Sequence, residues 1–272
     1  MGAKLSGRDW FYRGYALLIY VFLFAPILVV VMTSFNPTGR ATIPTEFTLE
    51  WYSELLDDTQ LMTALRTSLI VAVVSASVSA LLGLSAAYGL SRYRLPGRGA
   101  AQGVFYLPML VPAVVSGVSM LMWFRNINIE LGWPSIILTH VVVTLPFTMT
   151  IILTSFAGFD TRLEEAAMDL GATPWRTFRM ITLPLVMPGV LGGALMAFTL
   201  SFDEFVVTLF VSGGGVQTLP IVVYNRIRYM LSPEINAIAT LVMGFSIGLL
   251  AIAQGIIIIR RRRERSRQLE TA

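Results

Sequence analysis

Two adjacent carboxylates, Asp203 and Glu204, are the only charged side chains between Arg179 and Arg226. A carboxylate inside a hydrocarbon layer is costly unless it meets water, a partner or a cavity. Neighbouring helical residues point about 100° apart. We therefore expect Asp203 to face a pathway for a cationic solute and Glu204 to contact a neighbouring helix or subunit. The alternative is a structural pair that binds a partner subunit or lies in a wetted external segment.

The composition excludes several kinds of chemistry. The chain has no cysteine, which excludes disulfides, thiolate metal sites and a cysteine nucleophile. Its one lysine, Lys4, lies outside any glycine-rich loop, so the chain has no P-loop and any ATP is hydrolysed by another protein. The one histidine, His140, excludes an H-E-x-x-H zinc site, and we expect it to be packed or interfacial. An intramembrane enzyme would have only Asp203 and Glu204 to work with, so we disfavour that class.

Apolar residues make up 55% of the 272 residues and charged residues only 13%, against about 25% charged in soluble domains. Six apolar runs have the roughly 20 residues that a helix needs to cross a bilayer. The sequence therefore predicts an all-α polytopic membrane protein with a leader at 1–14, a membrane domain at 15–259 and a basic tail at 260–272. The expected spans are 15–34, 68–89, 104–124, 135–157, 189–210 and 235–259.

The basic residues predict the orientation of these spans. With both termini in the cytoplasm, 15 of the 20 Lys and Arg residues lie inside and five outside. Positive residues are concentrated in cytoplasmic loops, so this orientation is favoured. The arginine-rich tail is then expected to lie against anionic lipid, and we expect no nucleic-acid partner.

Residues 158–184 form the one long polar segment between two long apolar segments in the C-terminal half. Thr161 and Glu164 have the T-x-x-E spacing of a capping box at a helix start. Gly171 can adopt the left-handed conformation that closes a helix. Thr173 and Pro174 then suit the first positions of a second helix. The pattern predicts a short, rigid helix at the membrane surface, which suits a soluble partner, with an ordinary structured loop as the alternative.

Three features of this segment resemble the EAA loop of permease subunits from binding-protein-dependent ABC importers. They are Glu165-Ala166-Ala167, the glycine four residues later, and Ile181-x-Leu183-Pro184. The resemblance implies a type I, MetI-like permease fold and a coupling helix that docks on the ATP-hydrolysing subunit. By this resemblance, the coupling residues are Glu165, Ala166, Ala167, Asp169, Gly171, Leu183 and Pro184.

Other stretches are similar to the second permease of spermidine/putrescine-type systems, including the 16 residues from Phe198 to Gly213 that surround the acidic pair. The resemblance implies a polyamine as the solute. It also implies two ATPase subunits that bind ATP and magnesium, a second homologous permease, an external solute-binding protein and a bacterial inner membrane, with no cofactor or metal in this chain. Aminoethylphosphonate, opines and amino-acid-like compounds remain alternative solutes. A secondary transporter acting alone is the alternative class, weakened by the absence of an inverted repeat.

Smaller patterns predict how the helices pack. Small residues recur every four positions in the second span, at Ser75, Ser79, Gly83 and Ala87, and predict a seam for close helix packing. Proline residues at 108, 112 and 146 predict bends in the third and fourth spans. Short external helices are expected at 48–57 and 220–230.

Overall fold

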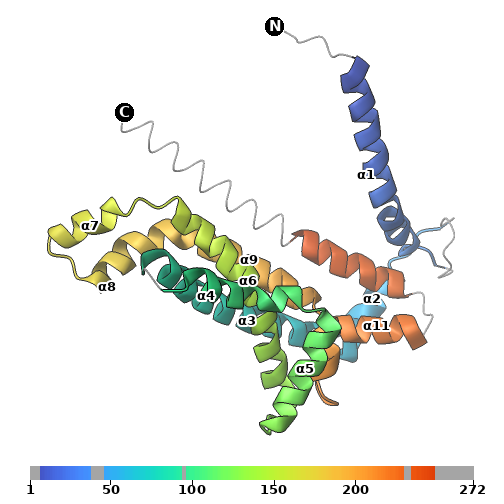
Figure 1. The fold of residues 1–272 in the computed structure, drawn as a ribbon. Helices are drawn as coiled ribbons and strands as arrows, with labels where there is room; N and C mark the ends of the chain where they lie inside the picture. The colour runs from blue at the N-terminus through green and yellow to red at the C-terminus, as the bar shows by residue number, and fades with distance from the viewer. Residues whose placement is uncertain (1–6, 38–45, 94–95, 230–233, 249–272) are drawn as a thin grey trace. The chain divides into compact units, whose positions relative to one another are not determined.

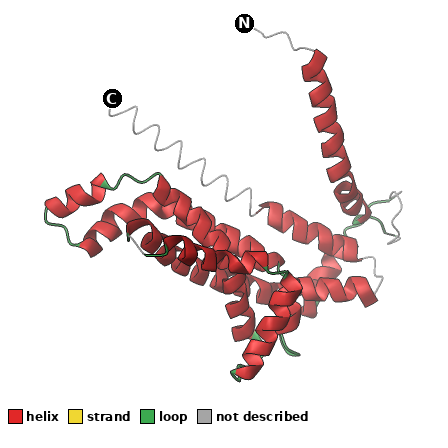
Figure 2. Cartoon of the chain, in the orientation of Figure 1, coloured by secondary structure: helices red, strands yellow, loops and turns green. Residues whose placement is uncertain are grey.

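A computed structural model of the chain describes residues 7–37, 46–93, 96–229 and 234–248. Every regular element in these ranges is a helix (Figures 1 and 2), which confirms the all-α class. The chain divides into two compact units, which are considered separately. The first comprises Met1–Met62 and Val223–Leu250, and the second Thr63–Val222 and Ala251–Ala272.

The first unit is built mainly from three helices: α1 (Gly7–Thr33), α2 (Glu50–Asp57) and an apolar helix at Glu234–Gly248. Helix α2 confirms the short helix expected at 48–57. Its Trp51 indole donates a hydrogen bond to the Asn36 carbonyl at 3.0 Å, and its Leu55 is fully buried. These two contacts hold the amphipathic helix in place through one polar and one apolar anchor.

An ionic cluster in the first unit surrounds Asp58, at the corner between α2 and α3 (Thr59–Arg92). The Asp58 carboxylate accepts a hydrogen bond from the Leu61 N–H at 2.9 Å and pairs with Arg226, which also lies 3.6 Å from Glu234. Burial alone would raise the pKa of Asp58, but the bonds from Leu61 and Arg226 outweigh it and lower the pKa below its ordinary value. The ion pair therefore persists at neutral pH.

The second unit holds the central helix packing. Helices α6 and α9 pack together over an extensive contact, and α7 and α8 lie beyond their ends (Figure 1). Besides most of α3, the elements are α4 (Arg98–Leu110), α5 (Ala113–Asn126), α6 (Trp133–Ala157), α7 (Arg162–Asp169), α8 (Pro174–Thr177), the π-helical turn η1 (Phe178–Thr182), α9 (Leu183–Asp203), α10 (Val206–Val211) and the start of α11 (Leu219–Tyr229).

Among the described residues, four helices are long and apolar enough to cross a membrane: Trp10–Thr33, Thr59–Arg92, Trp133–Ala157 and Pro174–Asp203. The expected third span is instead two helices, α4 and α5, which meet at 103°. Pro112 causes the break because it has no N–H and holds Val111 in an extended conformation, with φ −86° and ψ 128°. Pro146 does not break α6, which continues through this residue.

Other expected boundaries also differ, and helix α3 extends beyond the expected 68–89 at both ends. Helix α1 begins at Gly7, within the expected leader. The fifth span begins at Pro174 and ends at Asp203, so the expected range of 189–210 is wrong at both ends. The described part of the last apolar helix ends at Gly248, and the rest of the expected sixth span and the basic tail lie outside the described residues.

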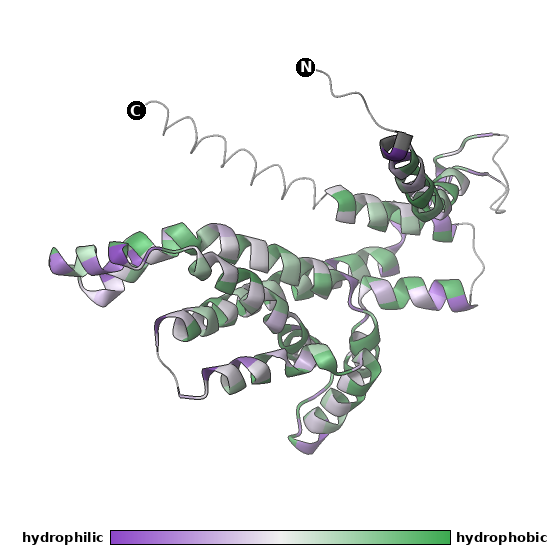
Figure 3. Ribbon diagram, turned by 45° about the horizontal axis from the view of Figure 1, so that its top comes forward, coloured by the Kyte–Doolittle hydropathy of each residue, from purple (hydrophilic) through white to green (hydrophobic). Residues whose placement is uncertain are grey.

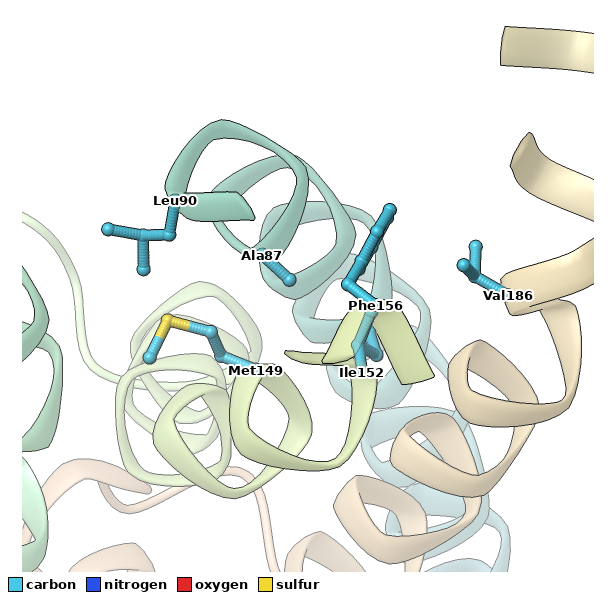
Figure 4. Close-up of a cluster of buried hydrophobic side chains, with 6 residues drawn as sticks. All are labelled: Ala87, Leu90, Met149, Ile152, Phe156 and Val186. Carbon is cyan, nitrogen blue, oxygen red and sulfur yellow. The ribbon is translucent and has the colours of Figure 1, made fainter. Parts of the chain in front are cut away.

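The small-residue seam of α3 is confirmed as a helix-packing surface. Ser79 is buried and its hydroxyl lies 2.7 Å from that of Thr144 in α6. A Cβ atom on Gly83 would lie 3.2 Å from the backbone nitrogen of Met149, also in α6. Ala87 is fully buried beside Met149, Ile152 and Phe156 (Figure 4). Small side chains at every fourth position thus bring α3 close to α6.

Glycine provides the same close approach where α9 packs on α6, beside the same Thr148 and Ile152 that Gly83 of α3 faces. A Cβ atom on Gly193 would lie 3.1 Å from both the carbonyl oxygen and the methyl carbon of Thr148. The neighbouring Gly192 has more room, since its nearest neighbour would be a methyl group of Ile151 at 3.6 Å. Val186 of α9 joins the apolar cluster with α3 and α6 residues shown in Figure 4.

The Gly192–Gly193 pair gives a matched test of this packing. Replacing either glycine with alanine makes the free energy of helix formation more favourable by about 1 kcal/mol. We expect Gly193→Ala to lower the midpoint of thermal unfolding in detergent, because its methyl group would push α9 away from Thr148. Gly192→Ala should leave the midpoint unchanged or raise it. Equal midpoints for the two variants would contradict the close α6–α9 packing.

Candidate functional site

The polar segment between α6 and α9 forms two short helices at one end of the second unit. Figure 3 shows hydrophilic residues gathered at this end, in α7 and the turn that follows it. Glu165, Ala166 and Asp169 of α7 are exposed, and Ala167 is half-buried. The helix therefore presents an accessible face that carries both carboxylates and a small side chain between them.

The start of α7 differs from the expected capping box. Thr161 has helical backbone angles and its hydroxyl caps nothing. Asp160 takes that role, since its carboxylate accepts a hydrogen bond from the Arg162 N–H at 3.0 Å. Glu164 does not reach back to the helix start either. The prediction of a Thr161–Glu164 capping box is wrong, because a tertiary partner competes successfully for the Glu164 carboxylate.

That partner is Arg92, the last residue of α3. Its Nε lies 2.8 Å from one carboxylate oxygen of Glu164, and its Nη2 donates to the other at 3.1 Å. Thr182, at the end of η1, donates its hydroxyl to the same carboxylate at 2.5 Å. The Arg92 guanidinium also lies over the rings of Phe156 and Phe159, 5.4 and 4.6 Å from their centres. One carboxylate thus joins α7, α3 and the start of α9.

No sequence pattern pointed to Arg92, Glu164 or Thr182 as functional residues. One signal was available for Glu164, which lies three residues before Ala167 and therefore on the same, inward face of α7. A carboxylate on the inward face of a short helix requires a positively charged partner. Arg92, at the end of the second apolar span, was a candidate for that partner. The separation of 72 residues between Arg92 and Glu164 meant that sequence alone gave no reason to pair them.

The end of α7 and the start of α8 follow the sequence prediction. Gly171 has a positive φ of 90°, its N–H donates to the Met168 carbonyl at 2.9 Å, and Ala172 N–H donates to the Ala167 carbonyl at 3.0 Å. These are the bonds of a left-handed helix end. Thr173 then accepts a bond from the N–H of Arg176 at 3.3 Å, which caps α8 as expected.

Leu183 and Pro184 occupy the first turn of α9 rather than the exposed face of α7. Leu183 is half-buried and Pro184 is exposed. They directly follow the π-helical turn η1, which ends at Thr182. The two parts of the expected coupling signature are therefore on different elements, and Glu164 connects those elements through Thr182.

The acidic pair does not lie on one continuous helix. Helix α9 ends at Asp203, and Glu204 is extended with φ −71° and ψ 111°. The Glu204 carboxylate accepts a hydrogen bond from the Val207 N–H at 3.0 Å and so caps the short helix α10. The assumption of a helical pair about 100° apart is wrong, because the capping bond ends the helix between the two side chains. Asp203 is exposed and makes no hydrogen bond or ion pair with any described residue.

His140 holds the chain on both sides of this break, and the expectation that it is packed is confirmed. It is 1% exposed, with Nδ1 2.7 Å from the Ser201 hydroxyl and Nε2 2.8 Å from the Thr208 hydroxyl. Thr208 donates its one proton to the Glu204 carbonyl at 2.8 Å. Nε2 must therefore carry the proton donated to Thr208, and in neutral histidine Nδ1 accepts from Ser201. A single ring in α6 thus ties α9 to α10 beside Asp203.

Residues 79–263 match the model of a family described as binding-protein-dependent transport system inner membrane component. The putrescine transport system permease protein PotI of Escherichia coli strain K12 is 38% identical over 263 residues, which cover 94% of this chain and 93% of PotI. The spermidine/putrescine transport system permease protein PotC of the same strain is 36% identical over 241 residues, which cover 89% of this chain and 91% of PotC.

The fold also matches a solved structure. A chain of a bacterial ABC transporter that imports the acidic polysaccharide alginate superposes with a TM-score of 0.75, over 93% of this chain and 99% of that chain. The two sequences are only 16% identical, so this likeness bears on the fold alone. It confirms the fold of an ABC importer permease that the EAA-type loop implied.

The His140 network can be tested by its contribution to stability. His140→Phe keeps a ring of similar size but leaves the Ser201 hydroxyl unpaired and removes one of the two hydrogen bonds of the Thr208 hydroxyl. We expect it to reduce the free energy of unfolding by about 2 kcal/mol, because each buried polar group left unpaired costs about 1–3 kcal/mol.

Thr199→Val is the control, since Thr199 lies on α9 with Ser201 and its hydroxyl bonds only within that helix, to the Leu195 carbonyl. Thermal unfolding in detergent measures both variants. An unfolding midpoint for His140→Phe that matches Thr199→Val would show that the network contributes nothing.

Proposed function

Because this chain belongs to the family of binding-protein-dependent transport system inner membrane components, we propose that it is the permease subunit of an ATP-driven importer of polyamines. The observation that supports this most strongly is the identity of 38% to a putrescine permease over nearly the whole length of both chains. In this proposal the chain forms half of the transmembrane pathway. It catalyses no reaction, and partner ATPase subunits bind ATP and magnesium.

The assembly follows from the same premise. A family dependent on binding proteins implies an external solute-binding protein, and one EAA-type loop per chain implies a second, homologous permease and two ATPase subunits. The chain crosses a bacterial inner membrane six times with both termini in the cytoplasm. The 15 to 5 distribution of basic residues supports this orientation. In this orientation α7 faces the cytoplasm, the side on which we propose the ATPase binds.

Helix α7 and its closing glycine form the docking surface for the ATPase. Glu165, Ala166 and Asp169 lie on its exposed face. Alanine lets a partner backbone approach closely, and the carboxylates supply charged contacts. The left-handed Gly171 turns the chain back toward the membrane within a few residues, so the docking helix stays short and its orientation is fixed.

Asp203 supplies the electrostatic attraction for a polyamine. Its exposed carboxylate lies at the C-terminal end of α9, where the helix dipole adds further negative potential. A multiply charged cation gains from both contributions, and an anion is repelled by both. Screening is weak away from bulk water, so a single carboxylate has a large effect on which solute enters.

Reconstitution tests the proposed function. The complete complex in proteoliposomes should take up putrescine only with ATP and with the binding protein, while this permease alone should not transport. Uptake by the isolated chain without ATP would identify a secondary transporter. ATP-dependent uptake of an aminoethylphosphonate, opine or amino acid in place of polyamines would retain the ABC role and overturn the polyamine assignment.

Gly171→Val should impair coupling, because a β-branched residue is strained at a φ of 90°. Glu165→Arg should impair it by reversing a charge on the docking face. We expect each to lower solute-stimulated ATP hydrolysis by about fivefold or more, if a docking contact contributes about 1 kcal/mol. Gly158→Val is the control, since its φ is −92° and nothing lies within 4 Å of an added Cβ. Full stimulation in both test variants would remove this role from α7.

Asp203→Asn should lower putrescine uptake at sub-saturating concentration by about tenfold, which corresponds to about 1.4 kcal/mol. The change preserves side-chain size and removes the charge. Glu204→Gln should have a smaller effect, because an amide oxygen can still accept the bond from the Val207 N–H. Radiolabelled uptake in complexes of verified composition measures both. If Asp203→Asn transports as well as the unmodified chain, the pair is structural.

A further inference from the structure

The Glu164 carboxylate connects the exposed helix α7 to two of the membrane-spanning helices. We call the three side chains that meet there, Arg92, Glu164 and Thr182, the clasp. Arg92 ends α3, and Thr182 directly precedes α9. One carboxylate oxygen of Glu164 accepts hydrogen bonds from Arg92 Nη2 at 3.1 Å and from the Thr182 hydroxyl at 2.5 Å, and the other lies 2.8 Å from Arg92 Nε as an ion-pair contact.

The clasp is shielded from water, so separating Arg92 from Glu164 costs more free energy than separating an exposed ion pair. The side chains of Arg92 and Glu164 are only 14% and 12% exposed. The rings of Phe156 and Phe159, at the end of α6 and just after it, cover the guanidinium. Ion pairs on a wetted surface contribute little, whereas separating a buried pair leaves a charge uncompensated and is strongly unfavourable. Pulling α7 away from α3 would require such a separation.

The other main contacts of α7 are with α8 and η1, the two short elements that follow it in the chain. In the described part of the chain, the Arg92–Glu164 pair is the only ion pair between α7 and a membrane-spanning helix. The following elements have their own link to α3, where the Phe178 ring meets Tyr88 edge-on with ring centres 5.1 Å apart. The chain enters α7 from α6 through Gly158 and leaves it through the left-handed turn at Gly171.

From this arrangement we propose that the clasp transmits the movement of α7 to α3 and α9, so that Arg92, Glu164 and Thr182 are positioning residues for energy coupling. The proposal rests on the proposed function. A movement of the ATPase displaces α7 by its exposed face, and the clasp on its inward face makes α3 and α9 follow. Because Asp203 lies at the other end of α9, the clasp links the docking helix to the helix that carries the solute carboxylate.

If the clasp transmits this movement, breaking it should produce a specific defect: the complex should hydrolyse ATP but transport little solute. Glu164→Gln removes the charge but preserves size, and Arg92→Gln removes the guanidinium. We expect each to lower the putrescine imported per ATP hydrolysed by about fivefold. The double variant should be no worse than either single variant, because residues that act through one contact are not additive. Arg92→Lys should recover only part of the ratio, since lysine keeps the charge but lacks the planar guanidinium that lies over Phe156 and Phe159.

The ratio of import to hydrolysis is chosen because a loss of folded complex lowers both quantities and leaves their ratio unchanged. Arg98→Gln and Glu130→Gln are matched controls, since both side chains are exposed and outside the clasp. An unmodified complex without ATP-dependent uptake would contradict the proposed function itself. A normal ratio in assembled Glu164→Gln and Arg92→Gln complexes, beside a functional unmodified complex, would overturn the clasp alone.

A distance measurement tests the same point without transport. Spin labels on Met168→Cys in α7 and Ser85→Cys in α3 report whether the two helices move together, and both positions are exposed. With the clasp intact, we expect one narrow distance distribution that is the same with and without nucleotide. With Glu164→Gln, the distribution should broaden or depend on nucleotide. A distribution unaffected by Glu164→Gln in every state would also overturn the proposal.

Discussion

The inward face of α6 carries a row of hydrogen-bonding side chains on which the neighbouring helices depend. Hydrocarbon offers no partners to polar groups, so each must be satisfied within the protein. Ser135 bonds the Val211 carbonyl of α10 at 2.7 Å, Thr144 meets Ser79 of α3, and His140 reaches both α9 and α10. Small residues on α3 and α9 allow the close approach that these bonds require. Helix α6 is therefore the fixed support for the second unit.

This support explains why the two candidate regions can be related although they lie on different elements. At one end of α9, the clasp holds α7 against the helices that pack on α6. At the other end, His140 fixes the break between Asp203 and Glu204. Glu204 is committed to capping α10, while Asp203 is left without a protein partner among the described residues. The same helix thus carries the connection to the docking surface and the carboxylate proposed for the solute.

Features determined by local geometry could be predicted from the sequence. The spacing of Ser75, Ser79, Gly83 and Ala87 defines one face of a helix, and that face packs on α6. Gly171 at a helix end and Thr173 before a proline act through their own backbone or hydroxyl, so no distant residue was needed to interpret them. The EAA-type loop gave the family for the same reason, since its residues are adjacent in the chain.

Features determined by distant partners could not be predicted. The spacing of Thr161 and Glu164 indicates a capping box, but Arg92, 72 residues away, binds the carboxylate instead. Apolar composition continues beyond Asp203, so hydropathy placed the helix end too late. The capping bond of Glu204 ends the helix there, and the ties from His140 hold the break. In each case a polar side chain had two possible partners, and tertiary packing decided between them.

We propose above all that α7 faces the cytoplasm and docks on the ATPase. The natural absence of cysteine allows single-cysteine variants without other changes. A photoreactive thiol label on Ala166→Cys of α7 should join this chain to the ATPase subunit on illumination of the assembled complex. The same label on Gly214→Cys, in the exposed turn after α10, should not. Cross-linking of the ATPase from position 214 and not from 166 would contradict the account.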